Sequence, residues 1–351
     1  MFASVSSNPR CSLEKLNPWA DETTHIISLR LRSNCTARHP IFSPRLRGLD
    51  EYLSGFRGER SPKVIYKGES VPRLPAMFEL VRPLNCLLAG LAVLIGAVVA
   101  GGGELSYTAG VAFAAAAIIS GAGNAVNDYF DRDIDAVNRP YRPIPSGRLS
   151  ARTAVILASC LFGAGVVLAA LINLPCLALA ALNSAVLFTY SLELKRRGLA
   201  GNLAIGYLVG STFLFGGLAV GEISVVGILA IMAALSTVGR ELIKGIEDME
   251  GDQKLGLKTF PLRYGAGKAA ALAIGFIAAA VAISPLPYVL KIFGWAYLAL
   301  VVPSIVAFIA AAAIIMRNWK PEAAGRASLA CKIAMGLGLL AFLAGVLAKL
   351  W

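Results

Sequence analysis

The feature that most constrains this chain is a series of long apolar stretches that fill it from Leu84 to Trp351. Each stretch approaches the ~20 residues that a helix needs to cross the ~30 Å hydrocarbon core of a bilayer. Charged residues make up only 15% of the 351 residues, against roughly 25% in a soluble domain. Because helices satisfy their own backbone hydrogen bonds inside lipid, the sequence predicts an all-α membrane protein rather than a large soluble one.

Hydropathy, together with the Gly and Pro residues that mark helix ends, predicts nine membrane-spanning helices whose joining segments alternate in charge. The segments after helices 1, 3, 5 and 7 lack Lys and Arg, whereas those after helices 2, 4, 6 and 8 are basic. The positive-inside rule therefore predicts a multi-pass protein of the cell membrane with its basic segments in the cytoplasm. The predicted spans are about 84–101, 105–128, 151–172, 175–192, 199–220, 222–244, 267–284, 287–315 and 328–350.

Residues 1–76 form a polar, basic extension in front of the predicted membrane domain, 77–351. The extension contains no clear apolar core of the kind that a secretory signal needs. Three interpretations remain: an organelle-type transit segment, a cytosolic extension, or a start codon upstream of a true start at Met77. We expect the extension to be poorly ordered in each case.

Composition excludes several classes of function. The net charge is +12, but the basic residues are dispersed between apolar spans without interleaved aromatics, so nucleic acid is not an expected partner. Anionic membrane lipids explain the sign of the charge better. The two histidines, His25 and His39, lie in the extension. The membrane domain therefore has no imidazole for a zinc site, a haem ligand or a Ser–His pair.

The first chemical motif lies where the second predicted span ends. Asn127, Asp131 and Asp135 follow an i, i+4, i+8 spacing, which places them along one helix face, and Asp128 flanks that face. Carboxylates that converge at the end of a membrane helix repel one another and lose hydration. They are tolerated only if a cation or several basic side chains lie among them.

The second motif lies at the end of the sixth predicted span, four spans later. Asp248 and Asp252 repeat the i, i+4 spacing, and Lys244 and Arg240 extend the same face. The two motifs resemble the halves of a duplicated unit, although transporters also contain such repeats. Ligands that are all oxygens, without nitrogen or sulfur, favour Mg²⁺.

Together the two motifs predict a site for a diphosphate. Carboxylates cannot bind a diphosphate directly, but Mg²⁺ bridges can, and nearby Lys and Arg can cover the remaining oxygens. Metal and cations would stabilise a departing diphosphate, while the apolar helices would accept a lipid tail. The predicted metal ligands are Asn127, Asp128, Asp131, Asp135, Asp248 and Asp252; the predicted catalytic residues are Lys244, Asp248 and Arg142; the predicted substrate-binding residues are Arg139, Arg142, Lys244, Lys254, Lys258, Arg240 and Asn124.

Other polar residues in the spans and loops have simpler interpretations. The run from Lys195 to Arg197 is interpreted as a determinant of membrane topology rather than a ligand contact. Asn183 is interpreted as a helix–helix hydrogen bond, and Glu241 as a partner of the basic loops. No residue is assigned as the base that takes a proton from an acceptor, and the pattern gives no oligomeric state.

The two motifs, Asn127-Asp-x-x-Asp131-x-x-x-Asp135 and Asp248-x-x-x-Asp252, in a nine-helix chain resemble the UbiA-type intramembrane prenyltransferases. The resemblance covers roughly residues 77–351. It implies a helical bundle around a central cavity, in which two Mg²⁺ ions hold a prenyl diphosphate. It also implies a cap made by the cytoplasmic loops after helices 2 and 6.

Four segments resemble the branch of this family that attaches a second geranylgeranyl chain to geranylgeranylglyceryl phosphate in archaeal ether-lipid synthesis. The resemblance therefore implies geranylgeranyl diphosphate as donor and a lipid-like acceptor. One departure is Gly245, where that branch usually carries Asp, so one acidic group near the second motif is missing. The four segments are 78–85, 138–147, 239–244 and 246–252.

Two alternatives stay open from the sequence. The segment from Pro140 to Gly147 also resembles chlorophyll-synthase-like members, whose acceptor is aromatic or a chlorophyllide, although those members typically lack an acid at the position of Asp248. A transporter is the alternative from a different class. Transporter sites lie near the middle of the bilayer, whereas the acidic motifs here lie at helix ends.

Overall fold

The computed structural model describes residues 73–350 except 102, 105 and 255, and the described part contains helices and no strands. Nearly all of the predicted extension, 1–76, lies outside the described residues, so its expected lack of order stays a prediction. The first described helix, α3 (Arg73–Val81), already begins four residues before Met77.

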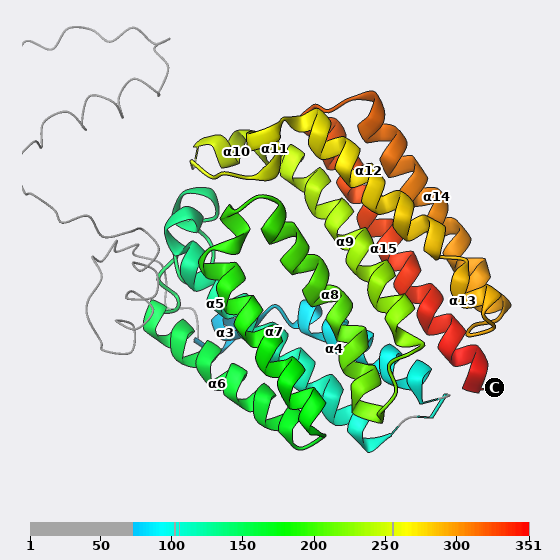
Figure 1. Cartoon of the computed structure of the whole chain (residues 1–351). Helices are drawn as coiled ribbons and strands as arrows, with labels where there is room; N and C mark the ends of the chain where they lie inside the picture. Colours follow the sequence, from blue (N-terminus) through cyan, green and yellow to red (C-terminus); the bar gives the residue numbers. More distant parts are fainter. Residues whose placement is uncertain (1–72, 102, 105, 255, 351) are drawn as a thin grey trace, which may run out of the picture. The chain divides into compact units, whose positions relative to one another are not determined.

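Nine helices of the described residues are long and apolar enough to cross a membrane, which confirms the predicted number of spans. They alternate in direction and, in the order of the chain, form the bundle shown in Figure 1. The nine helices are α4 (Pro83–Ala100), α5 (Tyr107–Asn138), α6 (Ala151–Ala170), α7 (Leu174–Leu192), α8 (Leu199–Val220), α9 (Val226–Glu247), α12 (Ala266–Ile283), α14 (Trp295–Arg317) and α15 (Pro321–Leu350).

Three helix boundaries differ from the predicted ones by more than four residues. Helix α5 continues ten residues beyond the predicted end at 128, and α15 begins at Pro321 rather than 328. Hydropathy marks where lipid contact ends, whereas a helix continues into water wherever its hydrogen bonds and side-chain pairs allow. The predicted span 287–315 is interrupted, because the short α13 (Leu286–Val289) is followed by a turn before α14 begins. Lys291 has a left-handed φ of 58° in this turn.

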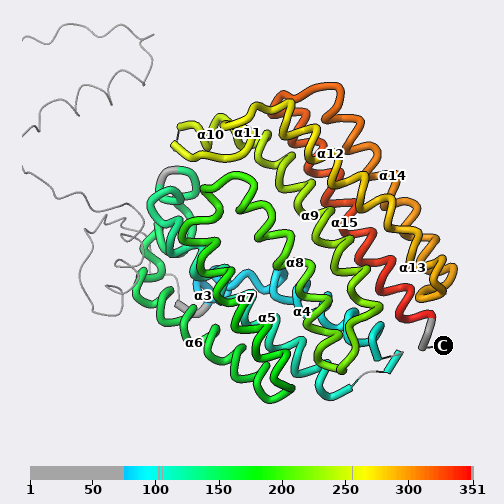
Figure 2. The backbone as a smooth tube through the Cα atoms, viewed as in Figure 1, coloured from blue at the N-terminus to red at the C-terminus, as the bar shows by residue number. Residues whose placement is uncertain are grey.

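Five short elements complete the described fold. Besides α3 and α13 they are η1 (Leu194–Arg196), α10 (Met249–Lys254) and α11 (Phe260–Tyr264). Figures 1 and 2 show α10 and α11 at the same end of the bundle as the C-terminal end of α5. We call this the cap end. It is the end at which both predicted acidic motifs lie.

Helix α4 packs closely against α8, and this contact holds the first half of the bundle against the second. Helix α8 also packs on α9, and α9 packs on α12 and α15. At the α4–α8 contact a Cβ atom on Gly216 would overlap the carbonyl oxygen of Val93, and one on Gly96 would overlap that of Phe213. Glycine at these positions lets the two backbones touch, as is common between membrane helices.

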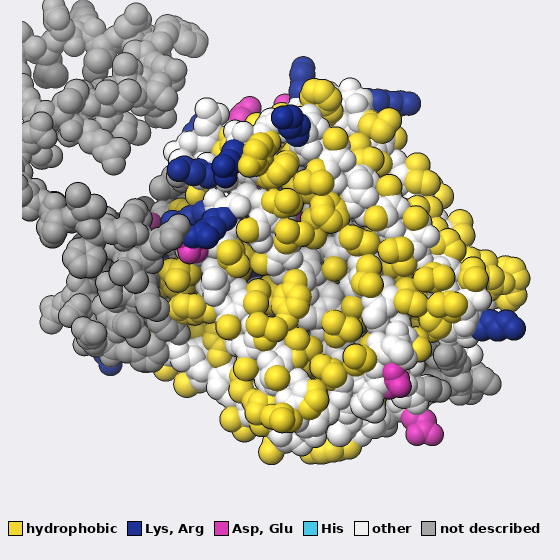
Figure 3. Space-filling view, viewed as in Figure 1, with side chains coloured by type: hydrophobic (Ala, Val, Ile, Leu, Met, Phe, Trp, Pro, Cys, Tyr) yellow, Lys and Arg dark blue, Asp and Glu magenta, His cyan; other side chains and the backbone are white. Residues whose placement is uncertain are grey.

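The outer surface is largely apolar, as contact with lipid requires. Figure 3 shows hydrophobic side chains over most of the visible face, with Lys and Arg side chains gathered mainly toward the cap end. Val306 and Ile309 of α14 are 60% and 56% exposed, which would be unusual in water. The described bundle therefore presents a surface that fits a bilayer.

Candidate active site

The first acidic motif lies on one face of α5 at the cap end, as its spacing predicts. Asp128 and Asp135 are buried, and Asn127 and Asp131 are half-buried. The amide Nδ2 of Asn127 donates a hydrogen bond of 3.0 Å to Oδ2 of Asp131, one turn later. Two buried carboxylates this close to each other require positive charge nearby.

Two arginines supply that charge at Asp128 and Asp135. Nη1 of Arg142 lies 3.2 Å from Oδ1 of Asp128 and 2.5 Å from Oδ2 of Asp135, so one guanidinium bridges both acids. Nη2 of Arg82 lies 2.5 Å from the same oxygen of Asp128. Arg142 was expected near this motif, whereas Arg82 was missed.

Arg82 occupies a special place in the backbone. It separates α3 from α4 and has a left-handed φ of 55°, which is uncommon for a residue other than glycine. The amide Nδ2 of Asn124 donates to the carbonyl oxygen of Val81, next to it, at 2.8 Å. The bend between α3 and α4 is thus tied to the acidic face of α5 by two side chains.

Lys195 forms an ion pair with Asp131, and sequence reasoning did not assign it to the site. The interpretation as a topology determinant missed this contact because the partners are 64 residues apart in the chain, and no spacing links them. The Lys195 side chain is only 15% exposed. Burial lowers the pKa of Lys195, and the neighbouring Asp131 opposes that shift.

The second acidic motif lies where α9 gives way to α10. Asp248 caps the end of α9, and the backbone N–H of Asp252 donates to the carbonyl oxygen of Asp248 at 2.9 Å, so the predicted i, i+4 spacing holds across the junction. Lys244 lies 3.9 Å from Asp248, and both side chains are about half exposed. Burial raises the pKa of Asp252, and the charge of Asp248 adds to the shift.

The segment between α7 and α8 connects the two motifs. Its residue Lys195 reaches Asp131 on α5, while Gly198, three residues later, packs against the segment that leads into α11. A Cβ atom on Gly198 would lie 3.2 Å from the backbone nitrogen of Phe260 and 3.5 Å from the carbonyl oxygen of Lys258. The acidic motifs therefore lie at the same end of the bundle, with this segment between them.

Three predicted substrate-binding residues remain apart from the acidic groups. Arg139, Lys254 and Lys258 are exposed at the cap end, and no ion pair joins them to a carboxylate in the described ranges. Their roles stay predictions. Glu241, expected to pair with the basic loops, instead forms an ion pair of 2.5 Å with its neighbour Arg240.

The donor chemistry of the two motifs suits Mg²⁺, because the predicted ligands offer only carboxylate and amide oxygens. Within the described residues, however, no three Asp, Glu, His or Cys side chains converge into a preformed metal site. The carboxylates of α5 are neutralised by Arg82, Arg142 and Lys195. A bound cation would therefore compete with these basic side chains for the same oxygens.

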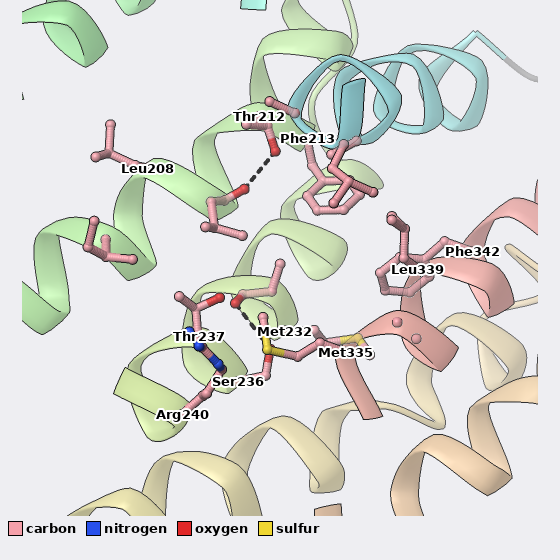
Figure 4. A pocket seen from close by; sticks show the side chains of 18 of the residues that line it. Leu208, Thr212, Phe213, Met232, Ser236, Thr237, Arg240, Met335, Leu339 and Phe342 are labelled. Carbon is pink, nitrogen blue, oxygen red and sulfur yellow. Dashed lines mark hydrogen bonds between the residues drawn. The ribbon is translucent and has the colours of Figure 1, made fainter. Parts of the chain in front are cut away.

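A cavity of about 790 Å³ lies within the bundle, next to both motifs. Asn124, one turn before Asp128, lines it from α5, and Arg240, one turn before Lys244, lines it from α9. Most of the other lining residues are apolar. Figure 4 shows Thr237 and Arg240 in one part of the cavity and Phe213, Leu339 and Phe342 in another. The arrangement offers a charged region next to space for a long hydrocarbon chain.

Residues 89–347 match the model of the UbiA prenyltransferase family. This match covers most of the chain, so the protein belongs to that family. It is an enzyme, a prenyltransferase of the membrane, and the transporter alternative is set aside.

Two relatives with similar sequences carry the name of one enzyme within this family. The chain is 46% identical over 274 residues to the digeranylgeranylglyceryl phosphate synthase of Methanopyrus kandleri. The match covers 78% of this chain and 99% of the relative. It is 43% identical over 279 residues to the enzyme of that name from Natronomonas pharaonis, covering 79% of this chain and 98% of the relative.

Solved structures agree with the fold. The described bundle is similar to a structure of a digeranylgeranylglyceryl phosphate synthase in membranes, with a TM-score of 0.70 and 38% identity over 79% of this chain and 99% of the other. It also resembles a UbiA homolog from Archaeoglobus fulgidus bound to DMAPP and Mg²⁺, with a TM-score of 0.60 and 20% identity over 78% and 99% of the two chains. At that identity the second likeness shows the fold alone.

Proposed function

We propose that this protein transfers a geranylgeranyl group from geranylgeranyl diphosphate to geranylgeranylglyceryl phosphate. The observation that carries the proposal is the acidic face of α5, held by three basic side chains beside an apolar cavity. The names of relatives that are 43% and 46% identical over nearly their whole length support the choice of substrates.

Mg²⁺ is proposed as the cofactor, held by Asn127, Asp131 and Asp135 of α5 and by Asp248 and Asp252 of the second motif. When bound, the metal would neutralise the diphosphate as the allylic C–O bond breaks. Asp128 was also a predicted ligand. Because Arg82 and Arg142 both contact it, we propose that it holds these arginines in place.

The basic side chains at the cap end have a proposed role of their own. Arg142, Lys195 and Lys244 already lie against the acidic groups, so they are placed to contact diphosphate oxygens that the acids repel. Fixed cations at this position stabilise negative charge on the leaving group as it develops. Three further basic residues at the cap end are exposed. They would contact the diphosphate only if the segments at the cap end move over the substrate. These residues are Arg139, Lys254 and Lys258.

The apolar part of the cavity is proposed to bind the prenyl chain and to exclude water from the allylic carbon. An allylic centre with cation character would otherwise be hydrolysed. The cap end is proposed to face the cytoplasm, which the alternation of basic segments supports.

The proposed reaction is tested with the purified full-length protein, geranylgeranyl diphosphate and a set of acceptors, with products read by mass spectrometry. We expect a digeranylgeranylglyceryl phosphate product that disappears with EDTA and returns with excess Mg²⁺. A product formed only with an aromatic or chlorophyllide acceptor would select the alternative. Turnover that is insensitive to chelator would contradict the role of Mg²⁺.

A further inference from the structure

The cavity has three charged lining residues, and the proposed transfer so far gives a role to none of them. They are Arg240 and Glu241 of α9 and Lys332 of α15. Lys332 lies inside the membrane span that runs from Pro321 to Ala348. A charged side chain inside a membrane span is costly, and such residues usually face a cavity that serves function.

Arg240 and Lys332 lie at the same depth in the bundle. Helices α9 and α15 are in contact, and a Cβ atom on Gly325 of α15 would lie 3.2 Å from Oε1 of Glu247, at the end of α9. Arg240 precedes Glu247 by seven residues, and Lys332 follows Gly325 by seven. At 1.5 Å per residue in two antiparallel helices, both lie about 10 Å below that level. The two cations therefore line the cavity from neighbouring helices at one height.

Several polar atoms of residues that line the cavity lack a hydrogen-bond partner among the described residues. Nε of Arg240, Oγ1 of Thr237 and Oδ1 of Asn183 are buried without a hydrogen bond, and all three residues line the cavity. Such groups are rare, because each one loses its hydration without compensation. Figure 4 shows Thr237 beside Arg240 on α9. A polar ligand in the cavity would satisfy these atoms.

The charge at this height favours an anion. Glu241 neutralises one of the two positive charges through its pair with Arg240. Lys332 forms no ion pair with a carboxylate of the described residues. The lining thus keeps a net positive charge, with guanidinium and ammonium donors that bind phosphate well.

We propose that Arg240 and Lys332 bind the phosphate of the acceptor lipid and so select an acceptor that carries a phosphate monoester. This rests on the proposed function, since it names the acceptor subsite of the same cavity. Both residues lie deeper than Lys244, which is one turn nearer the cap end than Arg240, so the diphosphate and the acceptor phosphate bind at different levels. The reacting hydroxyl of the acceptor is on the carbon next to the one that carries the phosphate. Binding the phosphate therefore holds that hydroxyl close to this site.

The preference for an acceptor that carries a phosphate follows from the groups of Arg240 and Lys332 that have no partner among the described residues. An acceptor without a phosphate would leave the ammonium of Lys332 without an anion and Nε of Arg240 without an acceptor, which a site of this kind disfavours strongly. We therefore expect the protein to bind geranylgeranylglyceryl phosphate about tenfold or more tightly than geranylgeranylglycerol.

The test measures equilibrium binding of these two lipids to the full-length protein in detergent, without donor. Lys332→Gln and Arg240→Gln are each expected to weaken binding of the phosphate lipid about tenfold and to leave binding of geranylgeranylglycerol and of geranylgeranyl diphosphate unchanged. Lys332→Arg keeps the charge and is expected to keep the preference. Lys268→Gln, which removes an exposed lysine of α12 that does not line the cavity, is the matched control.

Four other outcomes would overturn the inference. Equal binding of the two lipids by the unaltered protein, or an unchanged preference in both variants, would show that no phosphate subsite lies here. If the variants weaken binding of geranylgeranyl diphosphate as much as binding of the phosphate lipid, Arg240 and Lys332 would belong to the diphosphate site instead. If Lys268→Gln has the same effect, general surface charge is the cause. If the preference behaves as expected but no transfer product forms, the subsite stands and the proposed reaction fails.

Discussion

At the scale of single residues, the acids of the first motif on α5 are buried or half-buried, and each is paired with a basic side chain. Asp131 is contacted by the amide of Asn127 and the ammonium of Lys195, and Asp135 by the guanidinium of Arg142. Buried charges of this kind are stable only as pairs, so removing one partner leaves an uncompensated charge on the other. The effect of each substitution must therefore be compared with that of a similar residue whose side chain is exposed.

Asp131→Ala is expected to lower the transfer rate about a hundredfold or more, because it removes a proposed oxygen ligand of Mg²⁺ and the partner of Lys195. Asp133→Ala is the control, since Asp133 lies on the same helix with a side chain that is 87% exposed. The rates are compared in single-turnover assays. Equal rates for the two variants would refute the assignment of Asp131 to the metal site.

Lys195→Gln is expected to lower the transfer rate about tenfold to a hundredfold while Arg196→Gln, at the exposed neighbouring position, has little effect. The reason is that Lys195 alone of the two pairs with Asp131. Thermal unfolding of both variants separates a loss of chemistry from a loss of fold. An equal effect of the two substitutions would support the first interpretation, in which the segment from Lys195 to Arg197 only determines membrane topology.

At the scale of helices, small residues set how closely the elements approach. Gly245, the position where the resembling branch usually has Asp, faces α11: a Cβ atom there would lie 3.2 Å from Cγ of Pro261. The position where the acid is missing, Gly245, is therefore also a position where α9 packs tightly against α11. An Asp at this position would have to displace Pro261 by a few tenths of an ångström before it could contribute to the site.

Gly216→Ala is expected to lower the unfolding free energy by about 1–3 kcal/mol, because the added Cβ meets the backbone of α4, which cannot move without shifting the helix. Gly163→Ala on α6 is the matched control. No atom lies within 4 Å of the Cβ that it would add, so it should raise stability by about 0.5–1 kcal/mol through helix propensity. Melting temperatures in detergent check the opposite signs. A fall of the same size in both would contradict the close packing of α4 on α8.

At the scale of the whole molecule, the question is where the working domain begins. The predicted start at Met77 falls inside α3, whose residues Ala76 and Leu80 are fully buried, and α3 packs on α5. A boundary at Met77 would therefore divide a helix of the described fold, and the domain bounds 1–76 and 77–351 stay a prediction. A chain that starts at Met77 would lose the first turn of a helix that leads directly into Arg82.

Deletion of residues 1–72 is expected to leave transfer activity largely intact, because the described bundle and both acidic motifs remain. Deletion of residues 1–81 should abolish activity, since it removes α3 and the carbonyl of Val81 that Asn124 binds. Activity per mole of folded protein is the measurement. Complete loss with the shorter deletion would show that the extension belongs to the working enzyme.

Much of the fold was accessible from the sequence because hydropathy and helical period are local properties. Nine apolar stretches predicted nine helices, and an i, i+4, i+8 spacing predicted that Asn127, Asp131 and Asp135 share one face. The ends of the helices were less accessible. Helix α5 continues past its apolar part, and the turn at Lys291 interrupts a stretch that stays apolar on both sides.

The sequence by itself determined the membrane fold, the family and the helix face that the acidic residues of α5 share, since each depends on residues that lie close together in the chain. Only the tertiary structure decided which cations serve those acids. It brought Arg82 to Asp128 and Lys195 to Asp131, and it set Lys332 level with Arg240. Pairing across 46 or 64 residues depends on how the helices pack, and the spacing of residues along one helix carries no information about that.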